Sequence, residues 1–104
     1  MRFAVEFAPA ARHDLRRLYE HLLERAETVD DLQLAERALA AIETAALTQL
    51  AHTPFIFRKT EGSSLRRELL VPFGASGYVV LYEIAGPALV VVLAVRHQRE
   101  EDYH

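Results

Sequence analysis

The sequence predicts an α+β protein with an N-terminal strand, a hairpin of two antiparallel helices and a three-stranded antiparallel meander, which together form a four-stranded sheet. Two observations lead to this prediction. Apolar residues recur every three or four positions in the first half of the chain, as in helices, and alternate or form short runs in the second half, as in strands. The length of 104 residues also suits one domain, which we expect to span residues 1–104.

The first expected elements are a short strand and an amphipathic helix. Phe3, Val5 and Phe7 alternate with their neighbours, which predicts a strand with one buried face. Pro9 then suits the first turn of a helix, because its missing N–H is not needed there. An apolar stripe at steps of three and four predicts the helix itself; its members are Ala11, Leu15, Leu18, Leu22 and Ala26.

A second helix is expected after a tight connection over residues 27–30. Thr28 and Asp31 have the spacing of a capping box, with Asp in place of the usual Glu. A second apolar stripe follows, formed by Leu32, Ala35, Leu39, Ile42, Ala46 and Leu50. The short connection implies an antiparallel helical hairpin, and Pro54 ends it.

The remaining residues predict a polar loop over 58–64 and then three strands joined by short turns. The last strand, residues 88–95, is apolar on both faces and is expected at the centre of the sheet. The helical hairpin can cover one face of this sheet. The other face has only the C-terminal tail to cover it, so we expect either a partner protein or a tail that folds back.

Composition and charge exclude several classes of protein. Cysteine is absent, which excludes disulfides, Cys-ligated zinc and thiol nucleophiles, and we expect no metal site and no cofactor. The formal net charge is −3, which argues against a general nucleic-acid binder. Residues 58–99 nevertheless carry six basic side chains against three acidic ones, so the sheet half is locally basic and could hold a small anion site.

The N-terminal residues do not continue into the apolar run of a secretory peptide. The longest apolar stretch, residues 88–95, is far shorter than the roughly 20 residues that cross a bilayer. We therefore expect a cytoplasmic protein without membrane association.

The densest polar cluster covers residues 96–104. Its side chains could support general acid–base chemistry by His97, Tyr103 or His104, with Arg99 stabilising an anion. Cleavage of RNA by its own 2′-hydroxyl requires only such a base, an acid and a cation. The alternative is a mobile charged tail. The other histidines, His13, His21 and His52, lack metal-site spacing and are expected on helix surfaces.

The whole chain resembles the RelE/ParE superfamily of toxins from bacterial type II toxin–antitoxin systems. The resemblance rests on the order and spacing of several segments, which are residues 3–7, Asp14-Leu15, Arg67-Glu68-Leu69, residues 77–82 and Arg96-His97-Gln98-Arg99-Glu100. The last of these resembles the ParE-type plasmid stabilisation branch. One departure is Ala8, where the family often has a helix-capping Ser. The resemblance implies a curved sheet and a cognate ParD/RelB-like antitoxin as partner, with a homodimer as an option when the antitoxin is absent.

The superfamily combines two activities. RelE-like members are ribosome-dependent mRNA endonucleases, whereas ParE-like members poison DNA gyrase and are not themselves enzymes. For a nuclease, the resemblance implies a catalytic set at Arg67, His97, Arg99 and Tyr103, and the basic residues expected to bind substrate are Arg58, Lys59 and Arg96. Lys59 is the only lysine and the chain is acidic overall, so we favour the gyrase inhibitor and keep the mRNA endonuclease as the alternative.

Overall fold

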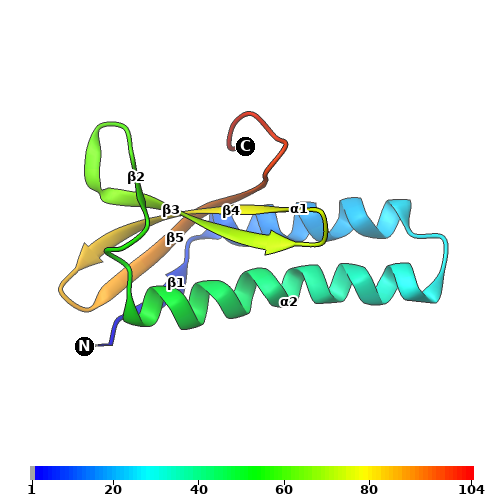
Figure 1. The fold of residues 1–104 in the computed structure, drawn as a ribbon, viewed down its shortest axis with the longest axis horizontal. Coiled ribbons are helices and arrows are strands. Elements are labelled where there is room, and N and C mark those ends of the chain that lie inside the picture. The colour runs from blue at the N-terminus through cyan, green and yellow to red at the C-terminus, as the bar shows by residue number, and fades with distance from the viewer. Residues whose placement is uncertain (1) are drawn as a thin grey trace.

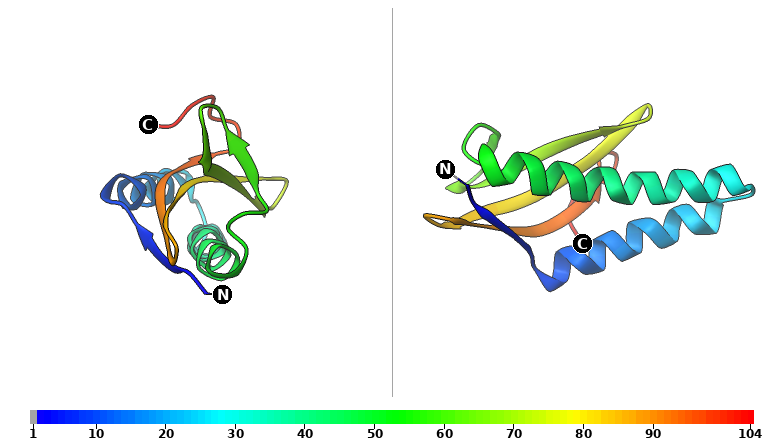
Figure 2. Two further views of the ribbon diagram at one scale, coloured as in Figure 1. Left: turned by 90° about the vertical axis from the view of Figure 1, so that its left-hand side faces the viewer. Right: turned by 90° about the horizontal axis from the view of Figure 1, so that it is seen from below.

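The computed structural model describes residues 2–104, and these residues form two helices and one five-stranded sheet (Figure 1). The elements are β1 (Ala4–Phe7), α1 (Pro9–Arg25), α2 (Val29–His52), β2 (Arg58–Thr60), β3 (Ser63–Phe73), β4 (Ser76–Gly86) and β5 (Leu89–His97). The sheet has the order β1-β5-β4-β3-β2. The predicted α+β class is confirmed, with the helical hairpin on one face of a curved sheet (Figure 2).

The sheet differs from the expected one in two respects. β1 pairs with β5 in parallel, so the sheet is mixed, although β3, β4 and β5 form the expected antiparallel meander. The prediction of a loop over residues 58–64 is wrong, because β2 lies there and makes a fifth strand. This strand is short and polar and lies at the sheet edge, with Arg58 and Lys59 exposed. It therefore lacks the apolar alternation by which strands are recognised.

Both helices begin where the sequence predicts. Pro9 lies in the first turn of α1. Before α2, the Asp31 N–H donates to Thr28 Oγ1 at 3.1 Å and the Thr28 N–H donates to Asp31 Oδ2 at 3.2 Å, which confirms the capping box. The backbone N–H groups of Glu27 and Thr28 also hold the pKa of Asp31 below its ordinary value. Leu32 is the exception in the second stripe, because it is exposed at the start of α2 instead of joining the core.

The core lies between the helical hairpin and the sheet. Its largest fully buried side chain is Tyr82 on β4, whose hydroxyl donates to the Pro54 carbonyl oxygen at 2.5 Å. Burial raises the pKa of Tyr82 to about 12. Tyr78 is also buried, so both tyrosines serve in packing, as expected from their shared strand face.

α1 continues along β5 where β1 ends. The last ladder contact of β1 is made near Val92, and the next part of β5 has no strand on that side. There the carboxylate of Asp14, which is 1% exposed, accepts the Val95 N–H at 2.9 Å. A buried carboxylate on α1 thus replaces a strand as the hydrogen-bond partner, and it places α1 beside the end of β5.

The C-terminal tail lies on the sheet face opposite the helices, as Figure 1 shows. The Tyr103 hydroxyl donates to Glu68 on this face, and the Arg96 guanidinium lies 5.2 Å from the centre of the Tyr103 ring. The tail therefore folds back over the sheet face that the helices do not cover, which is one of the two expected arrangements. It covers this face only in part, because Leu70 is 47% exposed. Neither helix in the described residues is long and apolar enough to cross a membrane.

Candidate functional site

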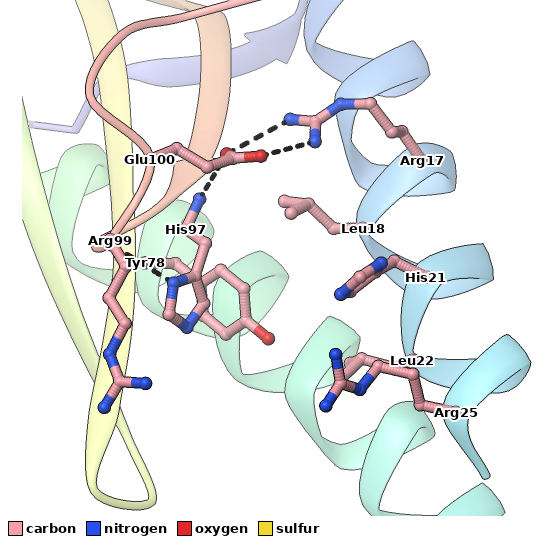
Figure 3. Close-up of a pocket in the computed structure, with 9 residues that line it drawn as sticks. All are labelled: Arg17, Leu18, His21, Leu22, Arg25, Tyr78, His97, Arg99 and Glu100. Atoms are coloured by element: carbon pink, nitrogen blue, oxygen red, sulfur yellow. Dashed lines mark hydrogen bonds and ion pairs between the residues drawn. The ribbon is translucent and has the colours of Figure 1, made fainter.

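A pocket of about 550 Å³ opens between α1 and the end of β5 (Figure 3). Its wall combines cationic, aromatic and apolar side chains, and it contains a single carboxylate. The lining residues are Arg17, Leu18, His21, Leu22, Arg25, Tyr78, His97, Arg99 and Glu100.

One side of the pocket is a row of basic side chains on α1. Arg17, His21 and Arg25 are spaced by four residues, so they lie on one face of the helix. This face is next to the stripe that contains the buried Leu18. Because Asp14 holds the helix against β5, the row faces the residues that follow the strand.

His97 and Arg99 form the opposite side. The His97 ring stands edge-on to the Tyr78 ring, with 5.4 Å between the ring centres. Its Nδ1 accepts the Arg99 N–H at 3.1 Å, so the neutral ring carries its proton on Nε2. Figure 3 shows Nε2 on the side of the ring that faces the pocket.

Glu100 closes one end of the pocket through an ion pair with Arg17. Arg17 Nη1 lies 2.7 Å from Glu100 Oε1, and Nη2 lies 3.4 Å from Oε2. Burial opposes ionisation of Glu100, but the hydrogen bonds from Arg17 and from the His97 N–H outweigh it, so the pKa is lowered. The Arg17 charge is thereby balanced. Arg25 and Arg99, in contrast, make no side-chain ion pair or hydrogen bond with any residue from 2 to 104.

Arg67 lies outside this pocket and holds the backbone around β2. Its Nη1 donates to the carbonyl oxygens of Phe55 and Phe57, at 2.6 and 3.0 Å, and its Nε donates to that of Ser64 at 3.1 Å. The guanidinium also lies 5.8 Å from the centre of the Phe55 ring. Arg67 is 9% exposed and binds three carbonyl oxygens, so it has the contacts of a structural residue.

Tyr103 lies on the face of the sheet opposite the helices. Burial, together with the hydrogen bond to Glu68, raises its pKa above the ordinary range of a tyrosine. Two of the expected substrate-binding residues have contacts there too. Arg96 Nη1 donates to the Glu100 carbonyl oxygen at 2.6 Å, and Arg58 pairs with Glu68 at 2.9 Å. Lys59 is exposed on the edge strand β2.

The four residues expected to form a catalytic set therefore do not converge. His97 and Arg99 share the pocket, whereas Arg67 and Tyr103 lie elsewhere and are engaged in other contacts. The α1 side of the pocket was not predicted from the sequence, where His21 was expected only as a helix-surface residue. The available signal was the spacing of Arg17, His21 and Arg25. Residues 2–104 contain no cluster of three or more His, Asp or Glu side chains placed to hold a metal ion.

Comparisons with known proteins find toxins of toxin–antitoxin systems among the relatives. Residues 5–102 match the family described as the ParE toxin of the type II toxin–antitoxin system parDE. The chain is 38% identical over 97 residues to the protein named Toxin RelE3 from Caulobacter vibrioides, an alignment that covers 93% of this chain and 96% of that protein.

Two solved structures share the fold. One is from the chromosomal ParDE toxin–antitoxin system of P. aeruginosa, with a TM-score of 0.68, 14% identity and coverage of 91% of this chain and 95% of that one. The other is from the toxin–antitoxin complex RelBE2 of Mycobacterium tuberculosis, with a TM-score of 0.63, 21% identity and coverage of 96% and 95%.

Proposed function

Because the chain belongs to the ParE toxin family of type II toxin–antitoxin systems, we propose that it acts as a ParE-like inhibitor of DNA gyrase and does not cleave RNA. A cognate antitoxin of the ParD/RelB type is its neutralising partner. The observation that supports this choice is the dispersal of the residues that a nuclease would use.

Arg67 is the clearest case. A nuclease needs a cation that is free to meet the scissile phosphate, but Arg67 already donates to three backbone carbonyl oxygens. Hydrogen bonds from charged groups contribute about 1.5–3 kcal/mol each. Moving this side chain to a substrate would break the bonds that hold the backbone around β2 in place.

Tyr103 offers a second argument. Its hydroxyl donates to Glu68, and its raised pKa keeps it protonated near neutral pH, so it does not supply a phenolate base. The net charge of −3 also weakens docking into ribosomal RNA, where neutralised phosphates provide much of the affinity.

The test is supercoiling by purified gyrase, with and without the protein. We expect loss of supercoiling and a trapped cleavage complex, both reversed by the antitoxin. Supercoiling that is unaffected, with no trapped complex, would overturn the proposal.

One observation favours the alternative function, a ribosome-dependent mRNA endonuclease. His97 and Arg99 share one pocket with three basic groups of α1, so an acid or base and several cations lie close together. Ribosomes programmed with mRNA test this alternative. Cuts in the A-site codon that disappear with His97→Ala would establish it, and intact mRNA would exclude it.

A further inference from the structure

The α1–β5 pocket is lined by groups that donate hydrogen bonds and lack partners inside the protein. Arg25 and Arg99 make no side-chain contact of this kind within residues 2–104, and Arg17 is the basic group there that is paired, through Glu100. Figure 3 shows Arg99 on one side and Arg25 and His21 on the other, with His97 and Tyr78 between them. These basic groups thus surround one pocket.

Tyr78 adds a hydrogen-bond donor to the wall of this pocket. The residue is only 5% exposed, yet its hydroxyl makes no hydrogen bond to any residue from 2 to 104 and points into the pocket in Figure 3. The fully enclosed side-chain atoms without a partner in these residues are Arg17 Nε and Arg96 Nε, so the Tyr78 oxygen is open to the pocket, where an acceptor can reach it. Burial also raises the pKa of Tyr78, which keeps the hydroxyl protonated as a donor.

The other polar groups around Tyr78, apart from Glu100, are also hydrogen-bond donors. With Nδ1 accepting the Arg99 N–H, the His97 ring has its Nε2–H available to the pocket. Arginine side chains have donors only. An occupant must therefore bring acceptors and negative charge, and the single carboxylate present, Glu100, is taken by Arg17.

From these groups we propose that the pocket binds a nucleotide unit, with the phosphate between Arg25 and Arg99 and the base against the apolar and aromatic wall. A phosphate has more acceptor oxygens than a carboxylate and so matches a set of two guanidinium groups, an imidazole and a phenol. Leu18, Leu22 and the His97 ring provide a wall for a flat base. The volume of about 550 Å³ lies within the usual range of small-molecule sites.

The unit could come from a free nucleotide or from a single strand, and the binding experiment separates the two. Isothermal titration of the full chain uses AMP, inorganic phosphate, a short single-stranded oligonucleotide and a glutamate-rich peptide as probes. We expect saturable binding of AMP or the oligonucleotide, tighter than that of phosphate. AMP binding assigns the site to free nucleotides, and oligonucleotide binding alone assigns it to a strand.

Three variants test the contacts. Arg25→Gln and Arg99→Gln should each weaken binding about tenfold at low salt, as expected when a charged hydrogen bond is lost. Tyr78→Phe keeps the packing and removes only the hydroxyl, so it should weaken binding about threefold to tenfold. Arg37→Gln is the matched control, because Arg37 is an exposed arginine on α2 that does not line this pocket. The affinity of the Arg37→Gln variant for the nucleotide probes should stay within about twofold of that of the unaltered protein.

The proposal is overturned if no nucleotide probe binds saturably, if phosphate binds as tightly as AMP and the oligonucleotide, or if the glutamate-rich peptide binds more tightly than either. The proposal is also overturned if Arg37→Gln loses as much affinity as Arg25→Gln and Arg99→Gln. No gyrase is present in this experiment, so its outcome is independent of the proposed gyrase inhibition.

Discussion

At the scale of single residues, two polar side chains replace backbone partners inside this protein. Asp14 accepts the N–H of Val95, and Arg67 donates to three carbonyl oxygens around β2. Both belong to segments that carry the resemblance to the RelE/ParE superfamily. Their contacts give these residues a structural reason to be present that is independent of catalysis.

Replacement of Asp14 tests the link between α1 and β5. Asp14→Ala leaves the buried Val95 N–H without an acceptor, so the free energy of unfolding should fall by about 1–3 kcal/mol in urea titration. Asp14→Asn keeps an acceptor oxygen, so its free energy of unfolding should fall by less. Glu24→Ala, at an exposed position of the same helix, is the control and should change stability by less than about 0.5 kcal/mol.

Replacement of Arg67 separates a structural role from a catalytic one. Lysine cannot reproduce the fork of donors, so Arg67→Lys should lower the free energy of unfolding by about 1–3 kcal/mol. Arg66→Lys is the control, because Arg66 forms an exposed ion pair with Glu83 and should change stability by less than about 0.5 kcal/mol. Unchanged stability for Arg67→Lys would contradict the structural role.

Gly77 is required by a close approach between β3 and β4. A Cβ atom at this position would lie 2.6 Å from the Val71 carbonyl oxygen. Gly77→Ala should therefore destabilise the protein by about 1–3 kcal/mol, measured by urea unfolding. Gly86→Ala, where nothing lies within 4 Å of the added Cβ, should be nearly neutral. Equal effects of the two substitutions would disprove this explanation.

At the scale of elements, the C-terminal tail is held by contacts at both faces of the sheet. Glu100 joins it to α1 through Arg17, and Tyr103 joins it to β3 through Glu68. The tail therefore belongs to the fold, and it helps to build the pocket wall at Glu100.

The tail contact should depend on pH. The pKa of Glu100 in the folded protein is below the ordinary value of 4.5, so the folded tail favours the ionised carboxylate. Its stabilisation is complete above pH 4.5 and is lost as the pH falls through the folded-state pKa. Hydrogen exchange of residues 97–104, measured relative to the intrinsic exchange rate at each pH, should rise over this range. Glu100→Gln should raise it already at neutral pH, and Glu101→Gln, whose side chain is exposed, serves as the control.

At the scale of the whole molecule, charge is segregated. The acidic total conceals a pocket in which Arg25 and Arg99 have no partner in residues 2–104. A single pocket of this kind cannot neutralise many phosphates of a duplex.

We therefore expect duplex DNA to bind the isolated protein with a dissociation constant weaker than about 10⁻⁴ M at physiological salt, the weak end of non-specific binding. Fluorescence anisotropy with a labelled duplex measures this. Micromolar binding would contradict the expectation and would indicate a basic surface larger than the pocket.

The sequence by itself determined the helices, the meander and the place of β5 inside the sheet, although β4 and not β5 is the central strand. These depend on local patterns, such as the capping box at Thr28, Pro9 at the start of α1 and the apolar run in β5. The resemblance to the superfamily rests on the same local segments in their order along the chain. Each of these features can be recognised from neighbouring residues, because hydrophobic periodicity and capping act within a few positions.

Only the tertiary structure decided the fifth strand and the site. β2 is a strand because β3 pairs with it, not because of its three polar residues. The pocket brings His97 and Arg99 to Arg17, His21 and Arg25, more than 70 positions earlier in the chain, whereas Arg67 and Tyr103 are drawn into other contacts. Which polar side chains meet depends on how α1 docks on β5, and that docking rests on long-range contacts, namely the buried apolar stripe of α1 and the hydrogen bond of Asp14 with Val95.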